Sequence, residues 1–285
     1  MNKVLISILL LSLFLLGGCN KETEEVKVEK KKPEKTETVE VNKEELSNLI
    51  NNYLNENQLD QNSLAICVYN FKTKESYELN GNIEFTAASL YKLPLAMAYY
   101  DKLNSKQLSL DTAYEFNEKH YEPVGVIAEK FPYGTFFTLE TLLNYVIVYS
   151  DNCAGHILYE NLGGWIAYKE EITKYTTHEL SANYYTYDNI VTANYMNDVL
   201  SYLYNNQDKY QTLIDNLYEA QPNTYLNKFL NEKTAQKYGL LDPELNAAGL
   251  VLGDNPYSIC ILSYNIEDAE THIGKLNQII YEYFN

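Results

Sequence analysis

The chain contains no arginine, so lysine supplies all 22 of its basic residues. Against 39 acidic residues this leaves a net charge of −17. Nucleic-acid phosphates are bound by basic grooves and arginine forks, and the composition therefore argues against nucleic-acid binding. An unfolded chain is equally unexpected, because 46% of the residues are hydrophobic and 28 are tyrosines, which is ample surface to bury.

Cysteine is scarce, with four residues in 285. Cys19 belongs to an N-terminal leader, and the odd number that remains provides no disulfide framework. No Cys-x-x-Cys or histidine-rich spacing indicates a metal, so we expect no metal and no cofactor. Cys67 and Cys260 lie in apolar, strand-like runs that could face each other across a sheet. We expect these two residues and Cys153 to be buried free thiols.

The N-terminal apolar run, residues 4–16, is shorter than the roughly 20 residues that span a bilayer. Lys3 precedes this run and Leu16-Gly17-Gly18-Cys19 ends it, which is typical of an export signal. The ending resembles a bacterial lipobox. That resemblance implies a signal peptide over 1–18, lipidation of Cys19, and anchoring at the extracytoplasmic face of the cell membrane. An ordinary secretory signal with an incidental cysteine is the alternative.

Residues 19–42 comprise this cysteine and a segment rich in Lys, Glu and Thr. Such a segment buries too little apolar surface to offset its chain entropy, so we interpret it as a flexible linker. From Asn20 to Asn42 six lysines face seven glutamates, and the negative charge therefore belongs to the domain expected over 43–285. We interpret that charge as a solubility feature of an exported monomer.

Hydrophobic periodicity and turn signals predict the fold of residues 43–285. Strands are expected at 63–71, 75–79, 234–241, 245–252 and 257–264, and helices at 44–54, 89–103, 139–148, 154–162, 188–204, 210–219 and from Ala269 to Tyr283. This order predicts a two-lobed α+β fold: a five-stranded antiparallel sheet from both chain ends, flanked by helices, with an inserted all-helical lobe. A ligand site is expected in the cleft between the lobes.

Ser89 and Lys92 place a hydroxyl and an amine at i and i+3 on the first turn of a predicted helix. A serine hydroxyl becomes a useful nucleophile when a neighbouring base accepts its proton. An amine with a lowered pKa can be that base, and the helix start offers free N–H groups to an oxyanion. Ser-x-x-Lys alone is weak evidence, because a helix cap followed by a solvated lysine has the same pattern.

Two further motifs strengthen the chemical interpretation: Ser150-Asp151-Asn152 in a loop between helices, and Lys237-Tyr238-Gly239 on a predicted strand. Together with Ser-x-x-Lys, this set resembles the class A β-lactamase and penicillin-binding protein superfamily of serine hydrolases. The sequences around these motifs, and Asn246-Ala247-Ala248-Gly249, resemble the family too. The likeness runs from about Glu44 to the C-terminus and implies a β-lactamase-like fold.

The resemblance implies a role for each matching residue. Ser89 would attack a carbonyl and become acylated, with Lys92 as the base or its assistant. Ser150 would relay a proton to the leaving nitrogen, Lys237 would supply positive charge to this relay and to a substrate carboxylate, and Asn152 would hold the substrate's side-chain amide.

The strand motif and its neighbours complete the implied site. The backbone N–H groups of Ser89 and Leu240 would form the oxyanion hole, with Gly239 just before Leu240. Asp151 is expected to brace its loop. Tyr238 stands where the family usually has Thr or Ser, and no arginine is available for the substrate carboxylate, so penicillin-like acids are expected to bind less well unless a lysine compensates.

Deacylation is the step for which the match is poorest. Class A enzymes carry Glu-x-x-Leu-Asn in a loop after the second motif, and that Glu activates the hydrolytic water. The local candidate is Glu179, which begins the Glu-Leu-Ser-Ala-Asn run of residues 179–183. It keeps the Glu and the Asn but has Ala in place of Leu, and a solvated loop acid is the alternative interpretation.

Three functions fit these observations. The first is a serine β-lactamase that opens β-lactams through a Ser89 acyl-enzyme. The second is a D-Ala-D-Ala peptidase-like or slowly deacylating protein acting on peptidoglycan peptides with the same residues. The third is a non-catalytic lipoprotein that keeps the scaffold as a ligand-binding surface.

Overall fold

The computed structural model describes residues 43–231 and 233–285. The predicted signal peptide, the lipidation site Cys19 and the linker up to residue 42 lie outside the described residues. Within the described part, no helix combines the length and the apolar character needed to cross a membrane.

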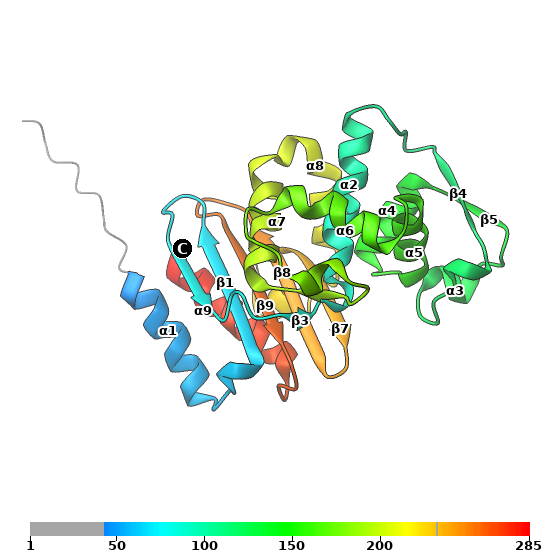
Figure 1. Ribbon diagram of the computed structural model, residues 1–285. Helices are drawn as coiled ribbons and strands as arrows, with labels where there is room; N and C mark the ends of the chain where they lie inside the picture. Colours follow the sequence, from blue (N-terminus) through cyan, green and yellow to red (C-terminus); the bar gives the residue numbers. More distant parts are fainter. Residues whose placement is uncertain (1–42, 232) are drawn as a thin grey trace, which may run out of the picture. The chain divides into compact units, whose positions relative to one another are not determined.

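A five-stranded antiparallel sheet is assembled from both ends of the domain, as predicted (Figure 1). Its order is β2-β1-β9-β8-β7. The strands are β1 (Leu64–Asn70), β2 (Ser76–Leu79), β7 (Ala235–Leu241), β8 (Glu244–Val251) and β9 (Tyr257–Ser263). Two small sheets pair β3 (Phe85–Thr86) with β6 (Ile190–Val191), and β4 (Ala113–Phe116) with β5 (Thr135–Thr138).

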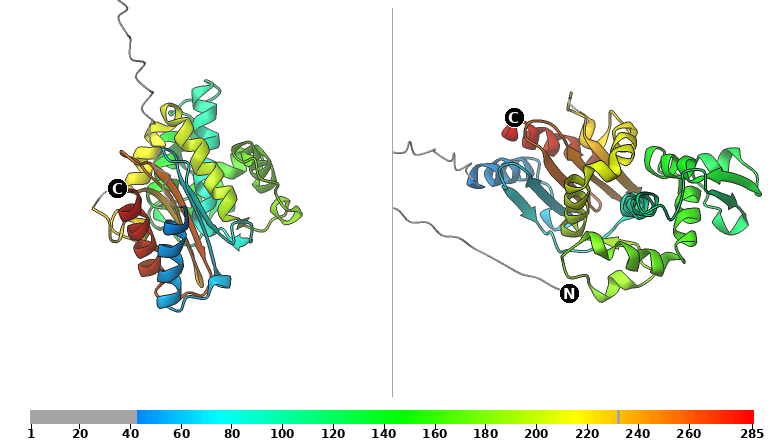
Figure 2. Two further views of the ribbon diagram at one scale, coloured as in Figure 1. Left: turned by 90° about the vertical axis from the view of Figure 1, so that its left-hand side faces the viewer. Right: turned by 90° about the horizontal axis from the view of Figure 1, so that it is seen from above.

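Helices cover both faces of the large sheet and build the inserted part of the chain (Figures 1 and 2). They are α1 (Lys43–Glu56), α2 (Lys92–Asn104), α3 (Val126–Lys130), α4 (Leu139–Val148), α5 (Asn152–Asn161), α6 (Trp165–Ile172), α7 (Ala193–Asn205), α8 (Gln207–Glu219) and α9 (Ala269–Phe284). In Figure 2 the terminal helices α1 and α9 lie together on one side of the sheet.

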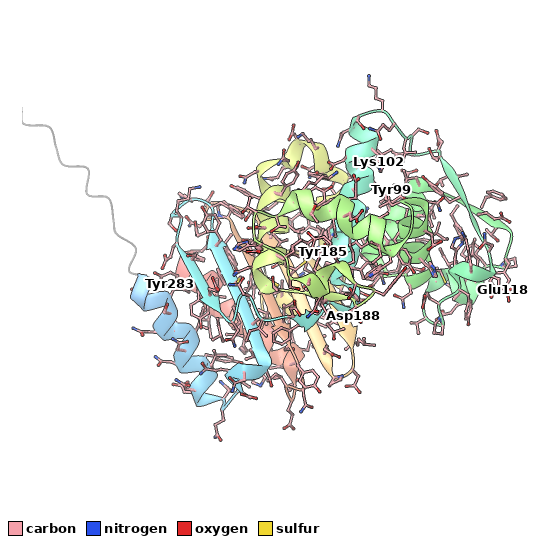
Figure 3. All side chains as sticks on the ribbon, viewed as in Figure 1. Tyr99, Lys102, Glu118, Tyr185, Asp188 and Tyr283 are labelled. Atoms are coloured by element: carbon pink, nitrogen blue, oxygen red, sulfur yellow. The ribbon has the colours of Figure 1, made fainter. Side chains whose placement is uncertain are left out.

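The alternation of side chains along the strands produces two hydrophobic cores. On β1, Ile66 and Val68 pack in the core shared with α1 and α9. Ala65 and Cys67 point to the opposite face and join the core of the helical part. Tyr99 on α2, labelled in Figure 3, belongs to this second core and is buried. Two-sided burial explains why the central strands read as nearly continuous apolar runs.

The three cysteines of the domain are buried free thiols, as predicted. Cys67 on β1 and Cys260 on β9 are directly opposite each other in the strand register. Burial raises the pKa of both thiols, so they are poor thiolates and inert toward oxidation.

Three expectations about the inserted part need correction. The chain from Ala88 to Tyr91 forms a 3₁₀ turn, and α2 begins at Lys92 rather than at Ser89. The helix expected from residue 188 begins at Ala193, because β6 precedes it and the Thr192 hydroxyl caps its first turn. The lobe expected to be all-helical also contains the β4–β5 pair, a non-local pairing with no strong turn signal.

Candidate active site

The 3₁₀ turn brings Ser89 and Lys92 together. With three residues per turn, side chains at i and i+3 lie almost directly above one another. Lys92 Nζ is 3.0 Å from Ser89 Oγ. Pro94 falls in the first turn of α2, where its missing N–H costs little. The geometry expected of the Ser-x-x-Lys pair is therefore present, although its helical turn is tighter than predicted.

The loop between α4 and α5 brings Ser150 and Asn152 to the same amine. Lys92 Nζ lies 2.6 Å from the Ser150 carbonyl oxygen, 3.4 Å from Ser150 Oγ and 2.6 Å from Asn152 Oδ1. Ser150 has a φ of +54°, an uncommon backbone conformation for a residue other than glycine. This conformation turns both its carbonyl and its hydroxyl oxygen toward the lysine.

Asp151 braces this loop, as expected, and does not face the serines. One of its carboxylate oxygens accepts a hydrogen bond from the backbone N–H of Ala154 and caps α5. The other accepts from the backbone N–H of Ile127, at the start of α3. Gly125 has to be glycine here, because its φ is +140° and a Cβ would stand 2.6 Å from the Asp151 carboxylate.

Strand β7 brings the third motif to the site. Side chains alternate along this edge strand, so Ala235, Lys237 and Gly239 share one face of it. This is the face that packs against the inserted helical part of the chain, because Ala235 belongs to that core. Lys237 Nζ donates to Ser150 Oγ at 2.9 Å and to the Tyr238 carbonyl at 2.8 Å. The hydroxyl of Ser150 therefore lies between two lysine amines.

Gly239 permits the closest approach of β7 to the turn that carries Ser89. A Cβ at this position would stand 2.7 Å from the Ala87 carbonyl oxygen and 3.0 Å from the Ser89 backbone nitrogen. Any larger residue would push the strand away from the nucleophile. Leu240 is the next residue of this edge strand, which packs against the turn that carries Ser89, and its side chain is exposed.

Two asparagines that the sequence analysis did not single out as functional hold the turn in place. Asn246 on β8 donates to the Thr86 carbonyl at 2.8 Å, and its own side-chain oxygen accepts from the backbone N–H of Ser263. Asn189 donates to the Ala88 carbonyl at 2.8 Å. Ala88 has a φ of +48°, a strained conformation that these contacts maintain.

Both lysines are buried, and neither forms a salt bridge within the described ranges. Burial lowers the pKa of Lys92 from 10.5 to about 7, although the charges of Asp151 and Glu122 act in the opposite direction. Burial and the charge of Lys92 lower the pKa of Lys237 as well. Removal of an ammonium from water without a carboxylate partner favours the neutral amine.

The hydrogen bonds around Lys92 fit a neutral amine. A neutral amine has two N–H donors and one lone pair. The carbonyl oxygen of Ser150 and the amide oxygen of Asn152 can only accept, so they take both N–H groups at 2.6 Å. Lys92 Nζ is placed to donate to Ser89 Oγ at 3.0 Å when it is an ammonium, and in the neutral amine the lone pair faces this hydroxyl and can accept its proton. The site is therefore arranged so that this lysine can act as a base toward Ser89.

Tyr238 forms an aromatic wall beside Lys237. Its ring stacks on that of Tyr225, with centroids 4.7 Å apart and planes 13° from parallel. The Nζ of Lys237 lies 4.2 Å from the centroid of the Tyr238 ring, so the amine packs against the face of the ring. A short hydroxyl at position 238 is thus replaced by a large, half-buried ring that contacts the lysine.

Glu179 is separate from these contacts. Its side chain is exposed and lines a cavity of about 130 Å³ together with Asn82, Glu84 and Tyr184. None of the hydrogen bonds found in the described residues joins Glu179 to Ser89 or Lys92. A part for Glu179 in deacylation stays a prediction of the resemblance.

The described residues hold no group of three or more His, Cys, Asp or Glu side chains placed to bind a metal ion.

Comparison with known proteins agrees with this architecture. A sequence profile of the beta-lactamase enzyme family matches residues 43–284, and the chain belongs to that family. Beta-lactamase VEB-1 of Pseudomonas aeruginosa is 27% identical over 166 residues, which are 51% of this chain and 53% of that protein. A beta-lactamase of Bacteroides uniformis is 32% identical over 123 residues, 42% of this chain and 40% of that protein. The match thus spans about half the length, or less, of these curated relatives.

Solved structures share the fold over nearly their whole length. A mutant of PBP-A, in its acyl-enzyme complex with penicillin G, has a TM-score of 0.73 at 18% identity and covers 84% of this chain and 97% of its own. The TLA-1 extended-spectrum beta-lactamase also has a TM-score of 0.73 at 18% identity, and the match covers 85% of this chain and 98% of that one. A beta-lactamase from Chitinophaga pinensis has a TM-score of 0.72 at 21% identity, and the match covers 85% of this chain and 100% of that one. The two-lobed fold with its antiparallel sheet is therefore confirmed.

Proposed function

We propose that the protein is a serine β-lactamase that opens β-lactam rings through an acyl-enzyme on Ser89. One observation carries the proposal: the Ser150 hydroxyl lies between the amines of Lys92 and Lys237, and Lys92 also reaches Ser89 Oγ. A nucleophile, a base and a proton relay are thereby within hydrogen-bond reach of one another, which is what acyl transfer requires.

In the proposed acylation, neutral Lys92 takes the proton of Ser89, and Oγ attacks the carbonyl carbon of the lactam. Negative charge develops on the carbonyl oxygen, which the backbone N–H groups of Ser89 and Leu240 stabilise. The C–N bond then breaks, and Ser150 gives its proton to the leaving nitrogen. Lys92 returns the proton it took to Ser150, directly or through Lys237, so that the proton count balances. Asn152 holds the side-chain amide of the substrate.

Deacylation needs a water molecule whose proton is taken while its oxygen attacks the ester. Glu179 is the carboxylate that the resemblance proposes for this step. The bond between the carbonyl carbon and Ser89 Oγ then breaks, and the proton taken from the water passes to Oγ. The products are the opened lactam acid and the free Ser89 hydroxyl, and Glu179 is again ionised.

A second candidate function, a slowly deacylating penicillin-binding or D-Ala-D-Ala peptidase-like protein, uses the same acylation residues. The exposed position of Glu179, outside the contacts of Ser89 and Lys92, favours it. Its natural substrate would be a peptide of the cell wall rather than an antibiotic.

Nitrocefin at a low enzyme concentration separates these functions. Sustained turnover supports the β-lactamase, whereas a single burst of one product per protein molecule supports the second candidate. Mass spectrometry after incubation with penicillin G checks the acyl-enzyme directly, and the Ser89→Ala variant is its matched control. Absence of both nitrocefin turnover and any penicilloyl adduct on the parent protein would leave only the non-catalytic, ligand-binding function.

We further propose that Cys19 is lipidated and that the mature protein is anchored, as a monomer, at the extracytoplasmic face of the membrane. The Leu-Gly-Gly-Cys ending of the leader supports this. Mass spectrometry of the N-terminal peptide from membranes would detect the lipid on Cys19, and the Cys19→Ser variant would lose it. Comparison of penicillin susceptibility in cells with the parent and the Ser89→Ala variant tests whether the protein confers antibiotic resistance.

A further inference from the structure

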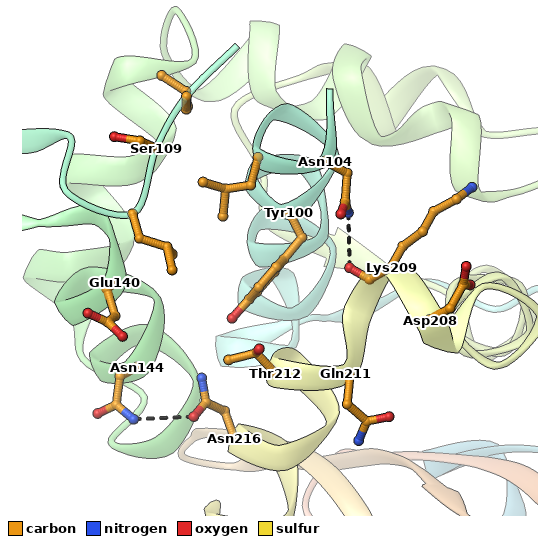
Figure 4. A pocket seen from close by; sticks show the side chains of 13 residues that line it. Tyr100, Asn104, Ser109, Glu140, Asn144, Asp208, Lys209, Gln211, Thr212 and Asn216 are labelled. Atoms are coloured by element: carbon orange, nitrogen blue, oxygen red, sulfur yellow. Dashed lines mark hydrogen bonds between the residues drawn. The ribbon is translucent and has the colours of Figure 1, made fainter. Parts of the chain in front are cut away.

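A cavity of about 530 Å³ lies between α2, α4, α8 and the chain that follows α2 (Figure 4). Ser89, Lys92, Ser150 and Lys237 are not among the residues that line it. Its volume is within the range of about 300–1,000 Å³ that is usual for sites of small-molecule binding. The cavity is therefore large enough for a ligand of its own, independent of the proposed acylation site.

The hydroxyl of Tyr100 is directed into this cavity without a protein partner. The side chain is only 7% exposed, and its hydroxyl forms no hydrogen bond with any residue that the structure describes. Figure 4 shows it in the space between Asn144 and Thr212. Burial and the charges of Glu140 and Asp215 raise its pKa to about 12, so at neutral pH it is a protonated donor. The hydroxyl oxygen itself is not among the fully buried polar atoms of the described residues, so it is accessible from the cavity and can donate to a ligand bound there.

The other polar groups of the cavity are mostly neutral and only weakly engaged. Asn144 and Asn216 share one long hydrogen bond of 3.3 Å, which leaves most of their amide donors and acceptors unused. Thr212 adds a hydroxyl, and Asn104 donates to the Lys209 carbonyl at the rim. Amides and hydroxyls that can both donate and accept match the hydroxyl groups of a ligand better than they match a single charge.

The remaining wall and the charges narrow the class of ligand. Leu103, Leu108 and Leu110 give the cavity an apolar side, which suits the C–H face of a sugar ring. Two carboxylates, Glu140 and Asp208, line it against one ammonium, so an anionic ligand is disfavoured. We propose that this cavity is a binding site for a saccharide of one or two rings that is uncharged or carries an amine.

Titration of the whole protein with three sugars, followed by calorimetry and by NMR, tests this proposal. N-acetylglucosamine and glucosamine are the uncharged and cationic probes, and glucuronate is the anionic control of the same ring size. We expect the first two to bind and glucuronate to bind at least about tenfold more weakly, because it meets the two carboxylates. Loss of one hydrogen bond in Tyr100→Phe should weaken binding about three- to tenfold.

Matched variants keep the result interpretable. Tyr100→Phe removes a hydroxyl without a protein partner, so its Tm should equal that of the parent. Asn144→Ala is a second cavity variant, and Tyr187→Phe, at an 81% exposed tyrosine outside the cavity, is the control that should bind normally. The proposal fails if no sugar binds, if glucuronate binds as well as glucosamine, or if both cavity variants, still folded, bind with unchanged affinity. Nitrocefin turnover is a separate measurement that none of these outcomes requires to change.

Discussion

Gly155 on α5 lies directly against the hydroxyl of Tyr91, the residue that precedes Lys92. A Cβ at position 155 would stand 2.6 Å from that oxygen and 3.3 Å from Lys92 Cε. We expect Gly155→Ala to displace Tyr91 and the base with it, and to lower kcat/KM for nitrocefin by about 10- to 100-fold, as small misplacements of reacting groups do.

A second substitution, Tyr91→Phe, combined with Gly155→Ala, tests the cause of this loss. Removal of the hydroxyl in Tyr91→Phe leaves ring carbon Cζ as the nearest Tyr91 atom, at an ordinary 3.5 Å. The double variant should therefore recover most of the activity that Gly155→Ala loses. If it stays as slow as the single variant, contact between residues 155 and 91 is not what positions Lys92.

The pH dependence of acylation should follow the pKa of Lys92. Burial lowers that pKa to about 7, so the amine is an ammonium below pH 7 and accepts no proton from Ser89. We expect kcat/KM for nitrocefin to rise with pH through about 7 and then to level off. Lys92→Ala should lose about 100- to 10,000-fold, the usual contribution of a general base. A parent profile that is flat through pH 7 would argue against Lys92 as the base.

Stability should change with pH for the same physical reason. Because the folded pKa of Lys92 is depressed, the unfolded chain binds more protons than the folded one between about pH 7 and 10. The free energy of unfolding should therefore rise with pH, by at most about 1.4 kcal/mol per pH unit for one proton. Urea unfolding of the parent and Lys92→Met between pH 7 and 9 measures this, and an equal slope in both proteins would contradict the expectation. Higher pH is avoided, because buried tyrosines with raised pKa values contribute there with the opposite sign.

Tyr238 offers a test of substrate recognition. Replacement of the stacked ring by the hydroxyl in Tyr238→Thr should improve binding of the penicillin carboxylate beside Lys237. We expect KM for penicillin G to fall by about tenfold, the effect of one hydrogen bond to a charged group, with kcat little changed. Tyr238→Phe keeps the stacking on Tyr225 and serves as the control. A raised KM in Tyr238→Thr would mean that the ring itself contacts the substrate.

Glu179→Gln tests the deacylation step. If Glu179 activates the hydrolytic water, its amide should slow release of the acyl group by about 100-fold, so that a penicilloyl adduct accumulates in the variant only. Mass spectrometry after rapid mixing with penicillin G detects this. Turnover equal to that of the parent would remove Glu179 from the mechanism, and a parent that already accumulates the adduct would support the slowly deacylating candidate.

Local patterns were sufficient to predict the sheet and most helices. The expected runs 234–241, 245–252 and 257–264 correspond to β7, β8 and β9 within one or two residues. Turn residues such as Pro243 and Gly253 end these strands sharply, which is why their boundaries could be predicted. The structure brings together the predicted residues of the three short motifs, which are Ser89, Lys92, Ser150, Asn152 and Lys237. They could be singled out because the residues of each motif lie near one another in the chain, whereas Glu179 lies apart from them.

Long-range contacts could not be predicted in the same way. Asn189 and Asn246 hold the backbone around Ala88 and Thr86 across 101 and 160 residues. Asn246 lies in a run that resembles the family, but the local sequence of neither asparagine indicates which backbone group it contacts. The small sheet of β3 and β6, which displaced the expected start of α7, also depends on a pairing between distant segments. Such partners are determined by the packed fold rather than by periodicity.

The left-handed backbone at Ala88 and at Ser150 has a consequence for the evolution of this protein. Each position costs about 1 kcal/mol or more relative to an unstrained residue; Ala88 adjoins the nucleophile Ser89, and Ser150 is itself the proposed proton relay. Glycine at either position would relieve this strain. At position 88 it would also let the turn that carries Ser89 adopt other conformations, and at position 150 it would remove the relay hydroxyl. Selection for heat tolerance alone would therefore act against catalysis at these two positions.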